Sequence, residues 1–222
     1  MPTHPDAPFR ITAFDWVPDF ARGYVRDLRP RWACEEIGLP YSTRLISAVE
    51  RPADHYARQP WGQVPVIEDD GLCMFESGAI LLHLGEKDER LLPRDREARA
   101  RVTSWLFAAY NSVEPLFFEI GNVEIFAADR EWAKLRRPSL LEEAGQRLDR
   151  LETAMGAREW LAGDFSIADI AMVTVLRDAA GTDLLDRRPR LAAYVDRGTS
   201  RPAFRAALAA QLADFRPDPV AA

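Results

Sequence analysis

Two adjacent polar residues, Glu76 and Ser77, stand where an expected β-hairpin leads into an expected apolar helix, GAILLHLGE. A helix N-terminus presents unpaired backbone N–H groups and the positive end of the helix dipole, so it attracts a carboxylate. The Ser77 hydroxyl can add a hydrogen bond to that anion, and the Glu76 carboxylate can pair with an ammonium group. The alternative is that Ser77 only caps the helix and Glu76 is solvated.

The clearest β-hairpin pattern in the chain precedes these two residues. Its apolar runs, VPVIE and LCMF, are joined by Asp69, Asp70 and Gly71, which favour a tight turn between strands. Upstream, RITAFDW at 10–16 and YSTRLI at 41–46 have the residue types and alternation of strands. The sequence therefore predicts four strands in its first part.

Helices are expected between these strands. RPRWACEEIG reads as a helix that ends at Gly38, and Pro30 must lie in its first turn or at a kink because proline lacks a backbone N–H. ERPADHYARQPWG at 50–62 predicts a short helix or an irregular turn. Together with the helix after Ser77, the element order is βαβαββα.

Everything beyond a charged linker, GEKDERLLPRDREAR, has helical periodicity. One long pattern runs from residue 96 to about 126, and we expect Pro115 to bend it or to end its first section. Two shorter helices, RLAAYVDRGT and AFRAALAAQLADF, are predicted near the end of the chain.

Two capping boxes predict helix starts in this second part. Ser139 and Glu142 form an S-x-x-E box before an apolar pattern that Gly156 ends. Ser166 and Asp169 form a similar box before IADIAMVTVLRDA. We assign the box of Ser166 and Asp169 a structural role, worth about 1 kcal/mol at a helix start.

Three segments together resemble the glutathione transferase superfamily. They are RQPWGQVPVIEDDGLCMFESGAILLHL at 58–84, RWACEEIGLPY at 31–41 and LAGDFSIADI at 161–170. The first is the most specific, because it joins Val-Pro, a hairpin and Glu-Ser before a helix. In order and spacing the three segments are similar to a complete member, over roughly residues 9–212.

The resemblance implies an α+β fold of two domains. A thioredoxin-like βαβαββα domain, residues 9–87, would hold glutathione, and an all-helical domain, residues 96–215, would shape a pocket for an electrophilic, apolar substrate. The implied reaction joins the glutathione thiol to that electrophile. Members of the family are usually homodimers, so a dimer is implied as well.

The resemblance also implies how glutathione is held. Pro65 is the position at which the family keeps a cis proline, and the backbone of Val64 would pair with the cysteinyl backbone of the peptide. Ser77 would bind the γ-glutamyl carboxylate, and Glu76 the ammonium group of the same residue.

Two further residues are candidates for the glycyl end of glutathione. They are Gln63, which precedes Val64, and His55, in the expected short helix. Either residue could instead be an ordinary surface polar residue, and the sequence does not decide between these interpretations.

Activation of the thiol is the least defined part of the implied site. A thiol has a pKa near 8.5, and lowering it by about two units needs about 2.7 kcal/mol of preference for the thiolate. The loop WVPDFARGYVRDLRPR lacks the usual Ser-Pro or Cys-Pro, and Tyr24 stands near the position of the family's activating group. Tyr24 is therefore the predicted donor, with Trp16, Arg22 and Arg26 as alternatives. Tyr24 could instead pack over the helix, with the arginines paired to acidic neighbours.

The implied second substrate would lie between that loop and the first long helix of the helical domain. Trp105, Tyr110, Asn111 and Phe118 are candidate lining residues, because aromatic walls with few polar groups suit apolar ligands. At helical spacing the same residues could belong to the core.

Neither cysteine stands where a mixed-disulfide nucleophile would sit. Cys34 falls inside the first expected helix and Cys73 in the hairpin. Thioether formation is therefore favoured over glutaredoxin-like chemistry. Two alternatives stay open: a glutathione-dependent isomerase or reductase on the same scaffold, and a non-catalytic binding or regulatory protein.

Composition limits the class of protein further. The 222 residues are 47% hydrophobic and 29% charged, with a formal net charge of −6, as in ordinary globular proteins. The sequence lacks the basic stripe that nucleic-acid binding requires, so no nucleic-acid partner is expected. Neither a signal peptide nor a long apolar run is visible, so we expect a cytoplasmic protein that is not bound to a membrane. Both cysteines are expected to be reduced and buried.

The three histidines, His4, His55 and His83, show no ligand spacing, so no metal is expected. His83 lies in the apolar run AILLHL, and we interpret it as a hydrogen-bonded packing residue.

Overall fold

The computed structural model describes residues 3–179 and 182–217. Contacts divide the chain into two compact units: Met1–Leu92 together with Ser200–Ala222, and Pro93–Thr199. The C-terminal helix thus clusters with the first unit, although its sequence pattern groups it with the other helices. In the described residues, no helix has the length and apolar character that crossing a membrane requires.

A four-stranded mixed sheet forms the centre of the first unit. Its strands are β1 (Arg10–Phe14), β2 (Ser42–Ile46), β3 (Val66–Asp69) and β4 (Leu72–Phe75), in the order β2-β1-β3-β4. β1 runs parallel to β2 and antiparallel to β3, and β3 and β4 form the predicted hairpin. Asp70 and Gly71 at its turn have φ angles of 48° and 81°, as a tight two-residue hairpin turn requires.

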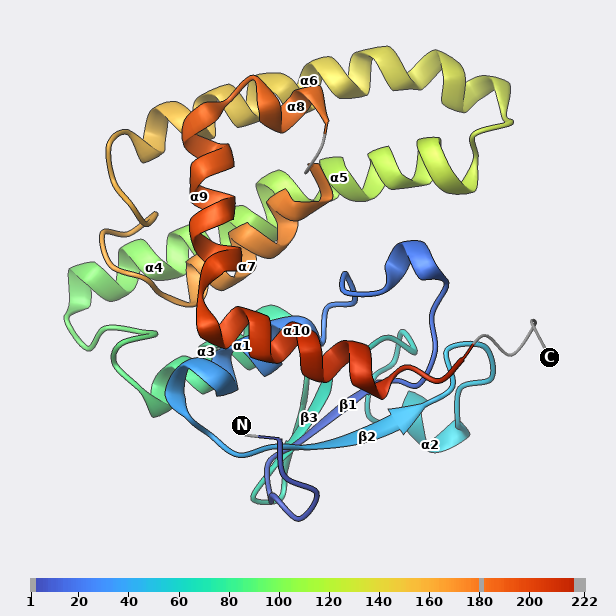
Figure 1. Ribbon diagram of the computed structural model, residues 1–222, viewed down its shortest axis with the longest axis vertical. Helices are drawn as coiled ribbons and strands as arrows, with labels where there is room; N and C mark the ends of the chain where they lie inside the picture. The colour runs from blue at the N-terminus through green and yellow to red at the C-terminus, as the bar shows by residue number, and fades with distance from the viewer. Residues whose placement is uncertain (1–2, 180–181, 218–222) are drawn as a thin grey trace. The chain divides into compact units, whose positions relative to one another are not determined.

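Four helices accompany the sheet (Figure 1). They are α1 (Leu28–Ile37), α2 (Ala53–Tyr56), α3 (Ser77–Lys87) and α10 (Pro202–Asp214), and a 3₁₀ turn, η1 (Asp19–Ala21), lies in the β1–α1 loop. Pro30 occupies the first turn of α1, and Gly38, with a φ of 69°, ends that helix as predicted. α10 packs directly on α1. The predicted order βαβαββα is confirmed.

The second unit is helical. It contains α4 (Arg96–Ala108), the π-helical segment η2 (Ala109–Val113), α5 (Glu114–Gly121), a second π-helical segment η3 (Asn122–Phe126), α6 (Glu131–Met155), α7 (Ile167–Leu176), the 3₁₀ turn η4 (Arg177–Ala179), α8 (Asp183–Asp186) and α9 (Pro189–Ser200). α5 and α6 pack as an antiparallel pair (Figure 1). α7 is the most deeply buried helix of the unit, since nine of its residues are inaccessible.

One predicted capping box is correct and the other is wrong. Ser166 and Asp169 form a full box at the start of α7, and the Tyr194 hydroxyl donates to the same carboxylate at 2.9 Å. Ser139, in contrast, lies inside α6, which begins at Glu131 and continues through Pro138. The carbonyl that Pro138 leaves without its helical partner belongs to an exposed stretch of α6, where water can satisfy it. Gly156 ends α6 as predicted.

Two smaller expectations have different outcomes. Cys34 is buried, but Cys73 is exposed, so the prediction that both are buried is wrong for Cys73. β4 is an edge strand, and its side chains are covered less than those of the strands inside the sheet. The hydrogen-bonded role of His83 is confirmed, because its Nε2 atom lies 2.6 Å from the Asp69 carboxylate.

Candidate active site

The start of α3 has an unusual backbone. Glu76, the residue before the helix, has a φ of 70° and a ψ of 111°. Residues other than glycine rarely adopt a backbone conformation with such a positive φ. Such conformations cost about 1–3 kcal/mol and cluster at ligand sites. Glu76 is exposed, whereas Ser77, the first helical residue, is buried. The alternative that Ser77 only caps the helix is therefore wrong: Glu76 holds the cap position, without a side-chain capping bond.

The Ser77 hydroxyl contacts a buried cation instead. The Arg29 guanidinium, in the first turn of α1, donates from Nη1 to the Ser77 Oγ atom at 3.1 Å. Arg29 is only 3% exposed, so its positive charge lies inside the unit and next to the N-terminus of α3. The arrangement adds a full charge to the partial positive charge of the helix end, which favours an anion there.

Sequence reasoning missed Arg29. Its position in the first turn of a helix predicts a solvated side chain, since arginine is rarely buried without a partner. Only the approach of α1 to α3, which the structure brings into contact, reveals its role.

The segment before β3 contains the predicted Gln63-Val64-Pro65 motif. The Val64–Pro65 peptide bond is cis, as expected. The sheet ladder begins at Val66, so Val64 and Pro65 lie just before it, and both side chains are buried. Gln63 is exposed.

Buried side chains hold the backbone of Gln63 from both sides. His55 Nε2 lies 2.8 Å from the Gln63 carbonyl oxygen, so that nitrogen must carry the proton. The Gln59 side-chain oxygen accepts from the N–H groups of Gln63, at 3.2 Å, and Trp61, at 2.6 Å. His55 is 0% exposed. It therefore positions the loop, and direct contact with a ligand would require the loop to move.

The β1–α1 loop carries the residues proposed for thiol activation. Tyr24 is 47% exposed and lies in a turn in which its N–H donates to the Ala21 carbonyl at 3.0 Å. Trp16 and Arg26 are half-buried. Arg22 is half-buried as well, and its Nε atom lies 3.3 Å from the Asp19 carboxylate.

A buried ion pair closes the loop where it joins α1. Arg31 Nε donates to Asp27 Oδ2 at 2.8 Å, and Arg31 Nη2 donates to Asp214 Oδ2 at 2.6 Å. Burial raises the pKa of the Asp27 carboxyl, against the opposing effect of Arg31. Burial lowers the pKa of Arg31, but the charges of Asp27 and Asp214 outweigh it and raise that pKa overall.

The residues predicted to line a second-substrate pocket all belong to the helical unit. Trp105, in α4, and Tyr110, in the π-helical segment η2, are half-buried, whereas Asn111 and Phe118 are exposed. The π-helical segment directly precedes α5, whose second residue is Pro115. Such segments often occur at functional sites.

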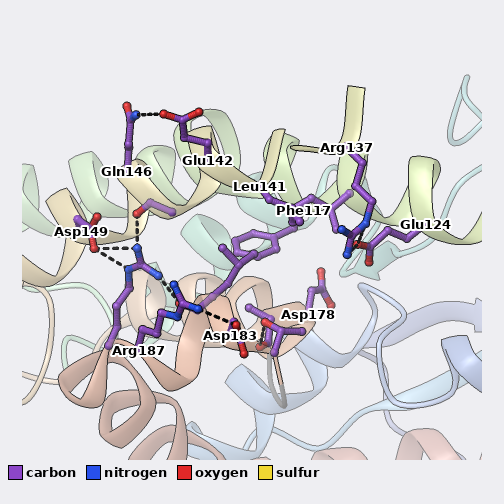
Figure 2. Close-up of a pocket in the computed structure, with 16 residues that line it drawn as sticks. Phe117, Glu124, Arg137, Leu141, Glu142, Gln146, Asp149, Asp178, Asp183 and Arg187 are labelled. Carbon is purple, nitrogen blue, oxygen red and sulfur yellow. Dashed lines mark hydrogen bonds and ion pairs between the residues drawn. The ribbon is translucent and has the colours of Figure 1, made fainter. Parts of the chain in front are cut away.

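A separate cavity of about 760 Å³ lies within the helical unit, between α5, α6 and α8 (Figure 2). Phe117 and Leu141 supply part of its apolar wall. Its arginines are paired, as Arg137 with Glu124 at 2.7 Å and Arg187 with Asp183 at 2.9 Å. None of the predicted pocket residues lines it. In the described ranges, no group of three or more His, Cys, Asp or Glu side chains could hold a metal.

Comparison with known proteins identifies the family. Residues 20–86 match the model of the glutathione S-transferase N-terminal domain, and residues 123–197 match that of the C-terminal domain. Glutathione S-transferase 4 of Zea mays is 32% identical over 200 residues, which cover 83% of this chain and 86% of the relative. The chain belongs to the glutathione S-transferase family.

Solved structures of glutathione transferases agree with this assignment. A family member from Pseudomonas fluorescens pf-5, with two glutathione bound, has a TM-score of 0.79 at 27% identity and covers 90% of this chain and 92% of its own. A glutathione transferase from Burkholderia graminis, with two glutathione molecules bound per subunit, also has a TM-score of 0.79, at 26% identity, and covers 90% and 87%. These findings confirm the predicted superfamily and the predicted α+β fold, in which a thioredoxin-like domain is followed by a helical domain. They also confirm that the chain belongs to a family of enzymes, the glutathione S-transferases.

Proposed function

We propose that this glutathione S-transferase joins the thiol of glutathione to the electrophilic carbon of an apolar small molecule. The observation that carries the proposal is the Arg29–Ser77 hydrogen bond beside Glu76. A buried cation, a buried hydroxyl and a helix N-terminus meet next to an exposed carboxylate held in a left-handed conformation. Complementary charges for a carboxylate and an ammonium group are thus present together, as an α-amino acid end requires.

In this proposal the γ-glutamyl end of glutathione binds at the start of α3. Its carboxylate takes the N–H groups of the first helical turn and the Ser77 hydroxyl, with the Arg29 charge behind them. Its ammonium group pairs with Glu76. Because the two groups of the γ-glutamyl residue are attached to one carbon, the two contacts also fix its orientation.

The rest of the tripeptide follows the segment before β3. The Val64 backbone, just outside the ladder, pairs with the cysteinyl backbone as a short strand would. Pro65 completes the motif, and Gln63, exposed on the same loop, contacts the glycyl end. His55 acts through the Gln63 backbone rather than on the ligand.

The sulfur then faces the residues of the β1–α1 loop. The Tyr24 hydroxyl donates a hydrogen bond to the thiolate, and Arg22, Arg26 and Trp16 are the alternative contacts. A hydrogen bond to a charged atom contributes about 1.5–3 kcal/mol, which is the size needed to lower a thiol pKa by one to two units. Tyr24 is 47% exposed.

The electrophile and the assembly complete the proposal. Trp105, Tyr110 and Asn111 supply an aromatic wall with one amide for the second substrate. The protein acts as a cytoplasmic homodimer in detoxification and needs no metal.

A second candidate is a glutathione-dependent disulfide reductase. The two relatives that bind two glutathione molecules favour it. In that reaction, one glutathione thiolate attacks a disulfide, which forms a mixed disulfide and releases one thiolate. A second glutathione thiolate attacks the glutathione sulfur of the mixed disulfide, which forms glutathione disulfide and releases the other thiolate. Buried Cys34 and the hairpin residue Cys73 take no part in this scheme.

Two assays separate these candidates from a non-catalytic protein. Retention on immobilised glutathione and elution by the free peptide test binding. Conjugation of chlorodinitrobenzene, compared with reduction of hydroxyethyl disulfide by glutathione, tests the reaction. We expect binding and conjugation; binding with reduction alone supports the reductase, and binding with neither reaction supports a binding protein. Absence of binding would contradict the whole proposal.

A further inference from the structure

The two residues that directly follow α10, Phe215 and Arg216, form a tail that lies against the β1–α1 loop. The Arg216 N–H donates to the Asp15 carbonyl at 2.8 Å, and Arg216 Nε lies 3.3 Å from the Asp15 carboxylate. Arg22 Nη2 donates to the Arg216 carbonyl at 3.3 Å, and the Arg22 guanidinium lies 5.8 Å from the centre of the Phe215 ring. Backbone, ionic and cation–π contacts therefore join the tail to the first half of the loop.

α10 itself fixes the second half of the loop. Gln211 Nε2 donates to the Val25 carbonyl at 3.0 Å and to Asp27 Oδ1 at 2.7 Å. Asp214, at the end of α10, pairs with Arg31 at 2.6 Å. Gln211 and Arg31 are buried, so the loop is bound to α10 at the end that enters α1.

The loop has little regular secondary structure. Between β1 and α1, its only regular element is the three-residue 3₁₀ turn Asp19–Ala21, in which no residue is buried. Two of its aromatic residues, Phe20 and Tyr24, are exposed. A segment with few buried apolar groups opens at low free-energy cost unless outside contacts restrain it.

We propose that Phe215 and Arg216, together with Gln211 of α10, are positioning residues that hold the β1–α1 loop in the conformation that activates the glutathione thiol. The inference rests on the proposed function, because Tyr24 and Arg22 are its thiol contacts. The tail reaches the loop at Asp15 and Arg22, before Tyr24, and Gln211 reaches it at Val25, directly after. The donor is thus held from both sides.

This arrangement separates thiol activation from peptide binding. Val64 lies just before β3, and Glu76 and Ser77 lie at the start of α3. Neither these residues nor Arg29 takes part in the tail contacts described above. Loosening the tail should therefore reduce the fraction of bound glutathione that is ionised but leave glutathione affinity nearly unchanged. A tail that only stabilised the fold would not produce that split.

The test uses the surface part of the contact, because replacing buried Gln211 could unfold α10. The test variant carries two changes, Phe215→Ala and Arg216→Ala. Arg216→Lys, in place of Arg216→Ala, should restore the ionic contact with Asp15. The control is Arg205→Ala, because Arg205 is an exposed arginine of α10. Hydrogen exchange of the loop peptide, ultraviolet titration of bound thiolate and the KM for glutathione are measured for each protein.

We expect the double variant to exchange loop amides at least about tenfold faster, with exchange in the β3–β4 hairpin unchanged. The thiol pKa should rise by about one unit, so roughly tenfold less thiolate forms at neutral pH, and KM should change less than twofold. Unchanged loop exchange overturns the inference, whatever the enzyme catalyses. Faster exchange with an unchanged thiolate titration, in a protein whose wild type ionises glutathione, also overturns it. A wild type that does not ionise glutathione contradicts the proposed function instead.

Discussion

The guanidinium of Arg29, at the start of α1, donates a 3.1 Å hydrogen bond to the hydroxyl of Ser77, at the start of α3. The contact joins two helices through residues that are 48 apart in the chain. It places a buried positive charge at the position where family resemblance implies that the γ-glutamyl carboxylate binds.

Replacing Arg29 with Met should weaken glutathione binding. The variant removes the charge but keeps an apolar side chain, and a hydrogen bond to a charged group is worth about 1.5–3 kcal/mol, so Kd should rise about 10- to 100-fold. Calorimetric titration with glutathione measures the change. Arg94→Met, an exposed arginine before α4, is the control and should bind as the wild type does. Equal affinity of both variants would remove Arg29 from the site.

Replacing Tyr24 with Phe should raise the pKa of the bound glutathione thiol. The change removes one hydroxyl and leaves the ring, so the loss of a single hydrogen bond to the thiolate predicts an increase of about one to two units. Ultraviolet absorbance of the thiolate, followed against pH, gives the value. Tyr56→Phe, at another exposed tyrosine, serves as the matched control. A curve that does not move would exclude Tyr24 and direct attention to Arg22, Arg26 or Trp16.

The two cysteines should differ in reactivity. Cys73 is exposed, whereas burial raises the pKa of the Cys34 thiol and keeps it protonated. We expect a disulfide reagent to modify one thiol of the native protein quickly and the second only after unfolding. Cys73→Ser should abolish the fast phase. Fast modification that survives in Cys73→Ser would show that the helix α1 opens.

Replacing Ser166 with Ala should destabilise the helical unit. The hydroxyl accepts from the Ala168 N–H at 3.3 Å and donates to the Asp169 carboxylate at 3.1 Å. Loss of such a cap costs about 0.5–2 kcal/mol, measured as the free energy of unfolding in urea. Thr153→Ala, an exposed hydroxyl inside α6, should change stability much less. A similar decrease in the free energy of unfolding in both variants would show that the capping box does not stabilise the helical unit more than an ordinary exposed hydroxyl does.

Features set by local chemistry could be predicted from the sequence. The turn at Asp70 and Gly71 needs positive φ angles, and the end of α1 needs one at Gly38, so both follow from the residue types. The box at Ser166 is confirmed because an apolar run follows it directly. The similar pattern at Ser139 gave a wrong prediction of a helix start, since a serine and a glutamate three residues apart also occur on the exposed face of a continuous helix.

Features set by contacts between distant segments could not be predicted. No local pattern indicates that Arg29 turns inward to reach Ser77, or that α10 packs on α1 and binds the loop before it. The burial of His55 depends in the same way on the loop that folds over it. The residues of the candidate site that differ from the sequence-based expectation therefore differ because of such long-range contacts, not because a strand or helix was predicted wrongly.

A calorimetric titration that compares glutathione with the dipeptide cysteinylglycine addresses the α3 end of the site most directly. The dipeptide has the same thiol and glycyl end but no γ-glutamyl residue, so Glu76, Ser77 and Arg29 have nothing to hold. Glutathione should bind saturably, and the dipeptide at least about 100-fold more weakly, which corresponds to about 2.7 kcal/mol. Equal affinity for the two peptides, or no binding of either, would contradict the assignment of this end of the protein to glutathione.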